Sequence, residues 1–240
     1  MTDTARLLAA VEGTWPPARA TRQGNWIIRD GAGGGKRVCA ATADGHATTQ
    51  DIAQAEAAMC ALGQARLFML RPGEDALDRQ LGDRGYAVVD PVNLYAAPVA
   101  LLTDVPIPRV TAFAVWEPLA IMAEIWAAGG IGPERIDVMH RATTKTGILA
   151  RHDDKPAGAA FVGLHDGVAM VHAVEVLPHQ RRKGVAVWMM RRAAFWAAAH
   201  GAETLSVLCT DANVPANTLY QRLGFAHVCG YHYRMHPEDV

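Results

Sequence analysis

The chain has 240 residues, 50% of them hydrophobic and 20% charged, and a formal net charge of −1 at pH 7. This length and composition suffice for a full core, in one large domain or two small ones. The near-neutral charge argues against a nucleic-acid-binding protein, because phosphate backbones require a basic face. No apolar run approaches the roughly 20 residues of a membrane span, and the first residues do not resemble a secretory signal. We therefore expect a cytoplasmic globular protein.

The cysteine and histidine spacings predict no metal site and no disulfide framework. The four cysteines are far apart and include no C-x-x-C pair, which favours ordinary buried thiols in a reducing cytoplasm. His232 and His236 have the i, i+4 spacing of metal ligands. No second pair supports them, however, and Pro237 would interrupt a helix there.

Residues 1–99 have the pattern of a small α/β domain. Helices are predicted at 4–12, 49–62 and 74–85, and strands at 26–29, 37–41, 66–70, 86–92 and 94–97. Thr48 or Thr49 is the expected N-cap of the second helix. The glycine-rich stretch after Asp30 lacks the spacing of a Walker A or dinucleotide-binding loop. It predicts a mobile hairpin tip between the first two strands.

Residues 100–110 contain Pro106 and Pro108 and are interpreted as a linker to a second domain, residues 111–240. That domain begins with two helices, at 116–128 and 132–141, the second with proline in its first turn. Strands at 144–152, 157–164 and 168–177 follow. The segment His165-Asp166-Gly167 predicts a tight hairpin between the last two. A three-stranded antiparallel meander therefore leads to the residues around Pro178.

The second domain is organised around residues 171–225. A strand ends at Pro178, a basic turn opens a largely apolar helix at 185–200, and a strand follows at 204–209, parallel to the first because a crossover helix joins them. A helix start leaves backbone N–H groups unpaired and attracts anions. Gly184 permits close approach of an anion, and Arg181, Arg182 and Lys183 add positive charge. The turn is therefore predicted to bind a phosphate or pyrophosphate.

Two motifs in this region resemble those of the GNAT superfamily of N-acetyltransferases. They are Val174-Glu175-Val176-x-Pro178-x-x-Arg181-x-x-Gly184-x-Ala186 and Asn213-x-x-x-Asn217-x-x-Tyr220-x-x-x-Gly224-Phe225. The resemblance implies an α/β (α+β) GNAT fold, with a mixed, mostly antiparallel sheet, a splayed parallel strand pair and flanking helices. Residues 1–99 resemble a shortened copy without the basic turn, which predicts a degenerate GNAT-like domain before the catalytic one.

The resemblance also implies acetyl-CoA as cofactor. The turn would hold its pyrophosphate, the strand before it would pair with pantetheine, and Asn213 would contact the pantetheine arm. The implied cofactor-binding residues are Val174, Glu175, Val176, Arg181, Arg182, Lys183, Gly184, Val185, Ala186, Asn213, Asn217 and Tyr220. Two positions depart from the commonest family form, since Arg182 stands where glycine is frequent and Ala186 replaces the last glycine.

Tyr220 falls where family members place the general acid for the leaving thiolate, although an aromatic packed beside Phe225 is the structural alternative. The general base stays open between His172 and Glu175. By strict alternation His172 shares a strand face with Val174 and Val176, and Glu175 lies on the other face. Each of the two could equally have a structural role.

Two functions follow from the resemblance. The first is an acetyl-CoA-dependent N-acetyltransferase that acts on a primary amine of a small molecule or peptide by direct attack in a ternary complex. The alternative is a non-catalytic acyl-CoA sensor or partner-binding module. We expect a monomer or homodimer whose partner is the acceptor amine, with neither nucleic acid nor membrane bound. The sequence does not identify the acceptor.

Overall fold

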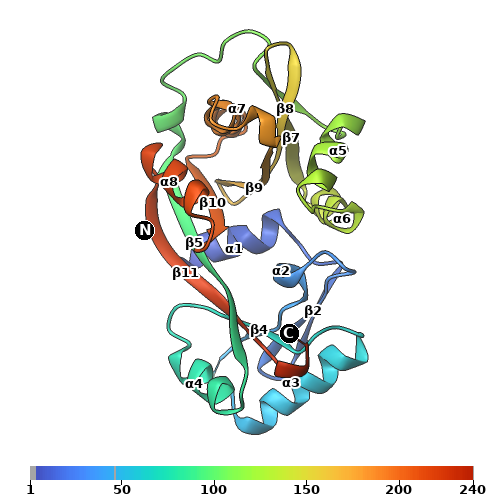
Figure 1. Cartoon of the computed structure of the whole chain (residues 1–240). Coiled ribbons are helices and arrows are strands. Elements are labelled where there is room, and N and C mark those ends of the chain that lie inside the picture. Colours follow the sequence, from blue (N-terminus) through green and yellow to red (C-terminus); the bar gives the residue numbers. More distant parts are fainter. Residues whose placement is uncertain (1–3, 46, 240) are drawn as a thin grey trace. The chain divides into compact units, whose positions relative to one another are not determined.

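The computed structural model describes residues 4–45 and 47–239, and residues 1–3, 46 and 240 lie outside the description (Figure 1). The described residues form two compact units. Unit 1 contains residues 4–16, Leu94–Cys209 and Val214–Val228, whereas unit 2 contains Pro17–Asn93, Thr210–Asn213 and the chain from Cys229 onward. Each unit is thus assembled from separate stretches of the sequence.

This division differs from the predicted boundaries at residues 99 and 111. Helix α1 (Thr4–Thr14) belongs to unit 1, and the chain changes units within the strands β5 (Ala87–Pro98) and β11 (Ala226–Met235). The expected linker begins instead with the 3-10 helix η1 (Val99–Leu102), whose Val99 and Leu102 lie in the unit 1 core. A prediction that assumes contiguous domains cannot place a boundary inside a long strand.

Unit 1 is built on a mixed sheet in which β10 lies between β5 and β9, followed by β8, β7 and β6. The strands are β6 (Ala112–Val115), β7 (Thr144–His152), β8 (Lys155–His165), β9 (Val168–Val176) and β10 (Thr204–Thr210). Neighbours from β6 to β9 are antiparallel, and β9 and β10 are parallel. The predicted meander and the parallel pair are both confirmed.

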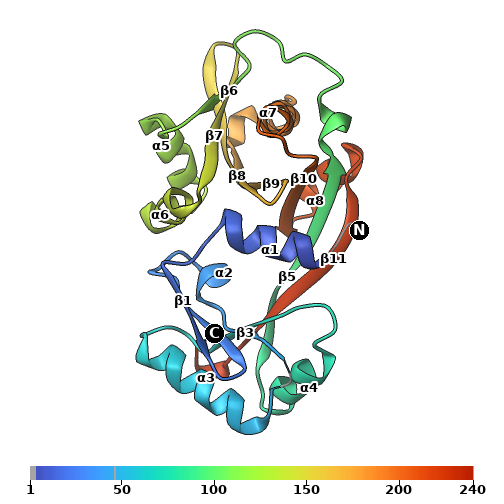
Figure 2. The ribbon, with the colours of Figure 1, turned by 180° about the vertical axis from the view of Figure 1, so that it is seen from behind.

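Helices cover both faces of this sheet. Helix α7 (Val185–Ala199) lies on one side of β7, β8 and β9, and helices α5 (Ala120–Ala128) and α6 (Pro133–Arg141) lie on the other (Figures 1 and 2). The α7 side holds the main core, where Met189, Met190 and Ala193 are fully buried. Helix α1 lies on the opposite side. It can approach β8 closely there because Gly163 of β8 has no side chain.

The contact between α1 and β8 predicts a measurable stability effect. A Cβ atom at position 163 would lie 2.6 Å from Cβ and 3.0 Å from Cα of Thr14, which is itself fully buried. Gly163→Ala is therefore expected to lower the free energy of unfolding by about 1–3 kcal/mol through overpacking. Urea denaturation followed by circular dichroism measures this loss. An unchanged midpoint would contradict the docking of α1 on β8 at this residue.

Unit 2 combines two groups of strands with three helices. The strands β1 (Arg19–Gln23), β2 (Trp26–Asp30) and β3 (Thr42–Ala43) form a small antiparallel sheet. Strand β4 (Leu67–Leu70) pairs antiparallel with residues 232–235 of β11. The helices are α2 (Lys36–Cys39), α3 (Thr49–Ala61) and α4 (Asp75–Asp83), and Trp26, Ile52 and Phe68 are among the fully buried core side chains.

One predicted hairpin in unit 2 was wrong. Strand β2 pairs with β1 across a turn at Gly24, whose φ of 57° is left-handed, and residues 36–39 form a short helix instead of a strand. Strand β1 is exposed along its whole length, so no apolar alternation marks it in the sequence. The predicted cap of α3 is confirmed, because Thr48 and Asp51 form a capping box.

No helix within residues 4–45 and 47–239 combines the length and apolar character needed to cross a membrane.

The four cysteines are free thiols, of which Cys209 and Cys229 are buried and Cys60 is exposed. The expectation that all four are buried was therefore wrong.

Candidate functional site

The two parallel strands of unit 1 separate part of the way along. Their register runs from Val168 opposite Thr204 to Val171 opposite Val207 and ends there, although β9 continues to Val176 and β10 to Thr210. Backbone groups in the last part of β9 are therefore not paired with β10. The splay implied by the sequence resemblance is present in the structure, directly before the basic turn.

A β-bulge interrupts β9 at the same place. Phe161 of β8 lies opposite His172 and Ala159 lies opposite Glu175, so β9 has one residue more than β8 over this interval. Ala173 has a left-handed φ of 51°. Its carbonyl oxygen accepts a hydrogen bond from Trp126 Nε1 at 2.9 Å. The extra residue resets the alternation of side chains along the strand.

The bulge overturns one prediction from strand alternation. Cross-strand partners share a face, so His172 and Glu175, opposite Phe161 and Ala159, lie on the same face of the sheet. Val174 and Val176 pack against the core on the α7 side instead. The expectation that His172 shares a face with Val174 was therefore wrong, because strict alternation does not survive an inserted residue.

The basic turn has the geometry of an anion-binding loop. After the 3-10 helix η2 (Pro178–Gln180), Arg182 and Gly184 have left-handed φ values of 65° and 78°, and Gly184 is the N-cap of α7. Successive backbone N–H groups in such conformations converge on one point and favour an anion. The four residues from 181 to 184 are exposed. Val185 is buried and Ala186 is half-buried. At these two positions a bound anion would therefore meet the backbone and not the side chains.

The cations of the turn are partly tethered to it. Arg181 Nε donates to the carbonyl oxygen of Val176 at 3.1 Å, and Lys183 Nζ donates to Gln180 Oε1 at 3.1 Å. These contacts hold the two side chains beside the start of α7. The predicted residues Arg181, Arg182, Lys183 and Gly184 thus lie together around one helix N-terminus.

The left-handed φ of Arg182 leads to a prediction for the effect of a glycine at this position. A non-glycine residue at φ 65° is strained. Arg182→Gly is therefore expected to leave the free energy of unfolding unchanged or raise it by up to about 1 kcal/mol. Urea denaturation tests this. Arg181→Gly at an extended φ of −67° is the matched control and should lower stability instead.

Tyr220 is buried on α8 (Val214–Arg222), with its ring 6.0 Å from that of Tyr95 and 6.1 Å from that of Phe225. The predicted packing beside Phe225 is therefore present. Burial raises the pKa of the phenol well above its ordinary value, and the neighbouring Cys209 and Glu175 add to the effect. A phenol in this environment stays protonated at neutral pH and is available as a proton donor.

Asn217 and Asn213 have different surroundings. Asn217 Oδ1 accepts hydrogen bonds from Tyr95 OH at 2.8 Å and from Cys209 Sγ at 3.4 Å, which ties α8 to β5 and β10. Asn213 belongs to the segment Thr210–Asn213 of unit 2, where its backbone N–H donates to the Thr210 carbonyl. No sequence signal pointed to Tyr95, which precedes the motif region by more than 70 residues.

Glu175 is half-buried, and its side chain lies against Gly129 at the end of α5. Burial raises the pKa of this carboxyl above its ordinary value, and the positive charge of Arg181 opposes the shift. A carboxylate with a raised pKa is a stronger base than an exposed one. The negative charge of Glu175 in turn contributes to the raised pKa of Tyr220.

His172 has a different environment, deep under α1. It is 4% exposed, with Nε2 2.8 Å from Thr14 Oγ1 and its ring 5.1 Å from that of Trp15. The Thr14 hydroxyl donates its proton to the Ala10 carbonyl, so Nε2 of His172 must be the donor to Thr14. These contacts give His172 a structural role in anchoring α1.

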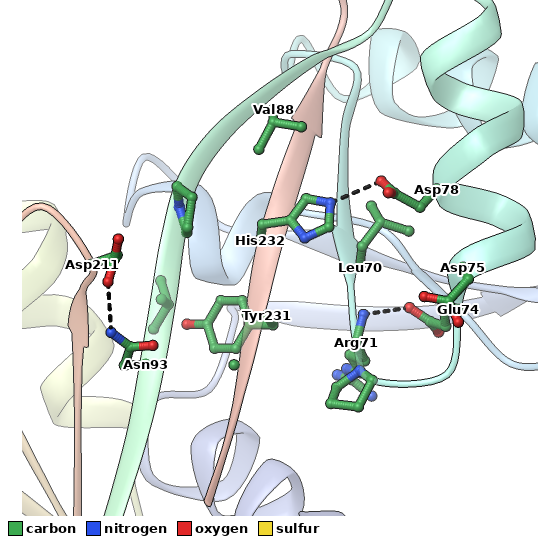
Figure 3. Close-up of a pocket in the computed structure, with 14 residues that line it drawn as sticks. Leu70, Arg71, Glu74, Asp75, Asp78, Val88, Asn93, Asp211, Tyr231 and His232 are labelled. Carbon is green, nitrogen blue, oxygen red and sulfur yellow. Dashed lines mark hydrogen bonds and ion pairs between the residues drawn. The ribbon is translucent and has the colours of Figure 1, made fainter. Parts of the chain in front are cut away.

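Unit 2 contains a separate pocket of about 360 Å³ between α4 and the strands β5 and β11 (Figure 3). Two of its carboxylates, Asp78 and Asp211, already have partners. Asp78 accepts from His232 Nε2 at 2.8 Å and from Arg234 Nε at 2.7 Å, and Asp211 accepts from Asn93 at 3.1 Å. In the described parts of the chain no three His, Cys, Asp or Glu side chains are grouped to hold a metal ion.

The sequence matches the acetyltransferase (GNAT) family over residues 117–225. This range includes the splayed strands, the basic turn and Tyr220. No curated protein matches the sequence significantly.

Solved structures share the fold over nearly the whole chain. A GCN5-related N-acetyltransferase from Kribbella flavida has 20% identity and a TM-score of 0.71, with 98% of this chain and 96% of that chain covered. A conserved protein of unknown function from Staphylococcus epidermidis has 11% identity and a TM-score of 0.68, with coverages of 92% and 94%. A tandem GNAT protein from the clavulanic acid biosynthesis pathway has 13% identity and a TM-score of 0.62, with coverages of 95% and 86%.

These similarities define an α/β GNAT fold with a mixed, mostly antiparallel sheet flanked by helices, in a two-domain layout. The fold class predicted from the sequence is confirmed. The resemblance to the GNAT superfamily seen in the sequence is confirmed over residues 117–225, which match its acetyltransferase family. The function class that follows is acyltransferase.

Proposed function

We propose that this protein is an acetyl-CoA-dependent N-acetyltransferase that acetylates a primary amine of a small molecule or peptide by direct attack in a ternary complex. One observation carries the proposal: β9 and β10 part at Val171, directly before a basic left-handed turn that opens α7. An open strand edge followed by an anion-binding turn suits a ligand with an amide-containing arm and a pyrophosphate. The family membership supports the same ligand class.

The residues present fit two parts of this cofactor, its pantetheine arm and its pyrophosphate. The backbone of Val174, Glu175 and Val176 would pair with the pantetheine arm, since this part of β9 is not paired with β10. The turn from Arg181 to Ala186 would hold the pyrophosphate through backbone N–H groups and three cations. We further propose that Asn217 lies along the arm. Acetyl-CoA would supply the acetyl group as a thioester.

The chain's own groups would handle the protons. Glu175 would accept a proton from the attacking amine, directly or through a water, because burial makes its carboxylate more basic. Tyr220 would hold a proton at its hydroxyl for the leaving group, because burial keeps the phenol neutral. His172 is the weaker candidate for the base, since it is buried against Thr14.

Calorimetric titration of the wild-type protein with acetyl-CoA tests the proposal, followed by an assay of thiol release with a panel of primary amines. Micromolar binding and turnover of at least one amine are expected. A folded protein that does not bind acetyl-CoA would overturn the proposed function. Binding without turnover on any amine would favour the non-catalytic acyl-CoA sensor.

A further inference from the structure

The last turn of α5 meets Glu175 where a side chain would not fit. A Cβ atom at Gly129 would lie 2.6 Å from Oε2 and 2.7 Å from Cγ of Glu175. The backbone of Gly129, with φ −89° and ψ 6°, is open to other residues. Space for the glutamate side chain, and not backbone conformation, is therefore what glycine provides at this position.

The same turn of α5 also contacts the bulge. Trp126 is fully buried, and its Nε1 donates to the carbonyl oxygen of Ala173 at 2.9 Å. Ala173 is the left-handed residue of the bulge, so this bond satisfies a carbonyl that faces α5. The bulge is also what places Glu175 on this face, as its register with β8 shows.

We propose that Trp126 and Gly129 are positioning residues for Glu175, with Trp126 holding the bulge and Gly129 leaving the space that the carboxylate occupies. The inference rests on the proposed function, because it takes Glu175 as the base. The charged and titratable groups that act on Glu175 are Arg181, which stabilises the carboxylate, and Tyr220. The end of α5 is the negative end of a helix dipole. Like burial, and unlike Arg181, it favours the protonated form of the Glu175 carboxyl.

The substitution Gly129→Ala is suited to a test. The atoms that its methyl group would meet are the far end of a flexible glutamate side chain. The carboxylate is therefore expected to move while the backbone stays in place, and the protein should fold. Gly130→Ala is the matched control, because a Cβ at Gly130 meets nothing within 4 Å, although its φ of 79° makes alanine strained there. The control thus perturbs the same turn without touching Glu175.

Two readouts separate positioning from general stability. Carbon-detected NMR of protein labelled at glutamate carboxyl carbons, with the Glu175 signal assigned by its loss in Glu175→Gln, gives the pKa of this carboxyl. Kinetics with the best amine of the panel gives kcat, KM and their pH dependence. Trp126→Phe keeps an aromatic side chain but removes the N–H donor together with the five-membered ring of the indole. Trp196→Phe in α7 makes the same change at a half-buried position that does not contact the bulge and is its control.

We expect Gly129→Ala to lower the pKa of Glu175 toward the ordinary range and to reduce kcat by about 10- to 100-fold, with acetyl-CoA affinity unchanged. Trp126→Phe should shift the same pKa, and both controls should match the wild type in both readouts. Wild-type values in Gly129→Ala and Trp126→Phe, while Glu175→Gln lowers kcat, would overturn the inference alone. An unimpaired Glu175→Gln would overturn both the assignment of the base and this inference.

Discussion

Gly184→Glu is expected to weaken acetyl-CoA binding by at least about 100-fold, or about 2.7 kcal/mol. Gly184 is the N-cap of α7 and has a φ of 78°, so it presents bare backbone at the anion-binding point of the turn. A glutamate here brings a carboxylate to the place proposed for the pyrophosphate. Repulsion between like charges then opposes the ligand that the helix N-terminus attracts.

Gly184→Ala separates charge from strain in this experiment. Alanine at φ 78° carries the same unfavourable backbone conformation without the negative charge. We expect it to melt at a temperature close to that of Gly184→Glu but to keep most of the affinity measured by calorimetry. Wild-type affinity in Gly184→Glu would show that the turn does not hold the phosphates.

Glu175→Gln is expected to lower kcat/KM by about 10²–10⁴-fold, the usual contribution of a general base. Burial raises the pKa of this carboxyl, and the base is its ionised form. The wild-type kcat/KM should therefore fall as the pH drops through that raised pKa. Glu175→Gln should lose the part of this low-pH limb that comes from Glu175. It should keep the pH dependence that comes from ionisation of the amine substrate.

His172→Gln is the informative comparison, because His172 lies on the same face as Glu175. It should lower stability through the lost contacts with Thr14 and Trp15 and leave the low-pH limb in place. Steady-state rates from pH 5 to 9 distinguish the two variants. If His172→Gln removes the limb and Glu175→Gln retains it, the roles of the two residues must be exchanged.

Sequence reasoning predicted the elements of unit 1 well because their signals are local. Pro178 ends a strand, Gly184 begins a helix, and His165-Asp166-Gly167 makes a tight turn, each through the backbone preferences of one or two residues. The capping box at Thr48 was readable for the same reason. The parallel pairing of β9 with β10 followed from the helix between them.

The shared face of His172 and Glu175 was not readable, because a bulge has no reliable sequence signal. Ala173 adopts a left-handed φ without being glycine or asparagine, and the donor to its carbonyl, Trp126, is 47 residues away. Gly129 appears in the sequence as an ordinary helix end. Its contact with Glu175 depends on how α5 docks on β9, which is a matter of tertiary packing.

The division into units was not readable from the sequence, for a further physical reason. Strands β5 and β11 each continue through a change of unit. Boundaries are normally recognised by flexible polar linkers. The proline-containing stretch after η1 has that composition but lies wholly within unit 1.

The way the chain is divided between the units bears on its synthesis at the ribosome. Unit 2 lacks the strand paired with β4 until residues 232–235 have emerged, more than 160 residues after β4 itself. Helix α1 cannot pack in its final place until β8 and β9 have been synthesised, since Thr14 contacts His172, which is 158 residues later in the chain. Most multidomain chains fold their N-terminal domain first. Here neither unit is complete before β11 is made, so we expect truncations that remove β11 to be captured by chaperones or degraded.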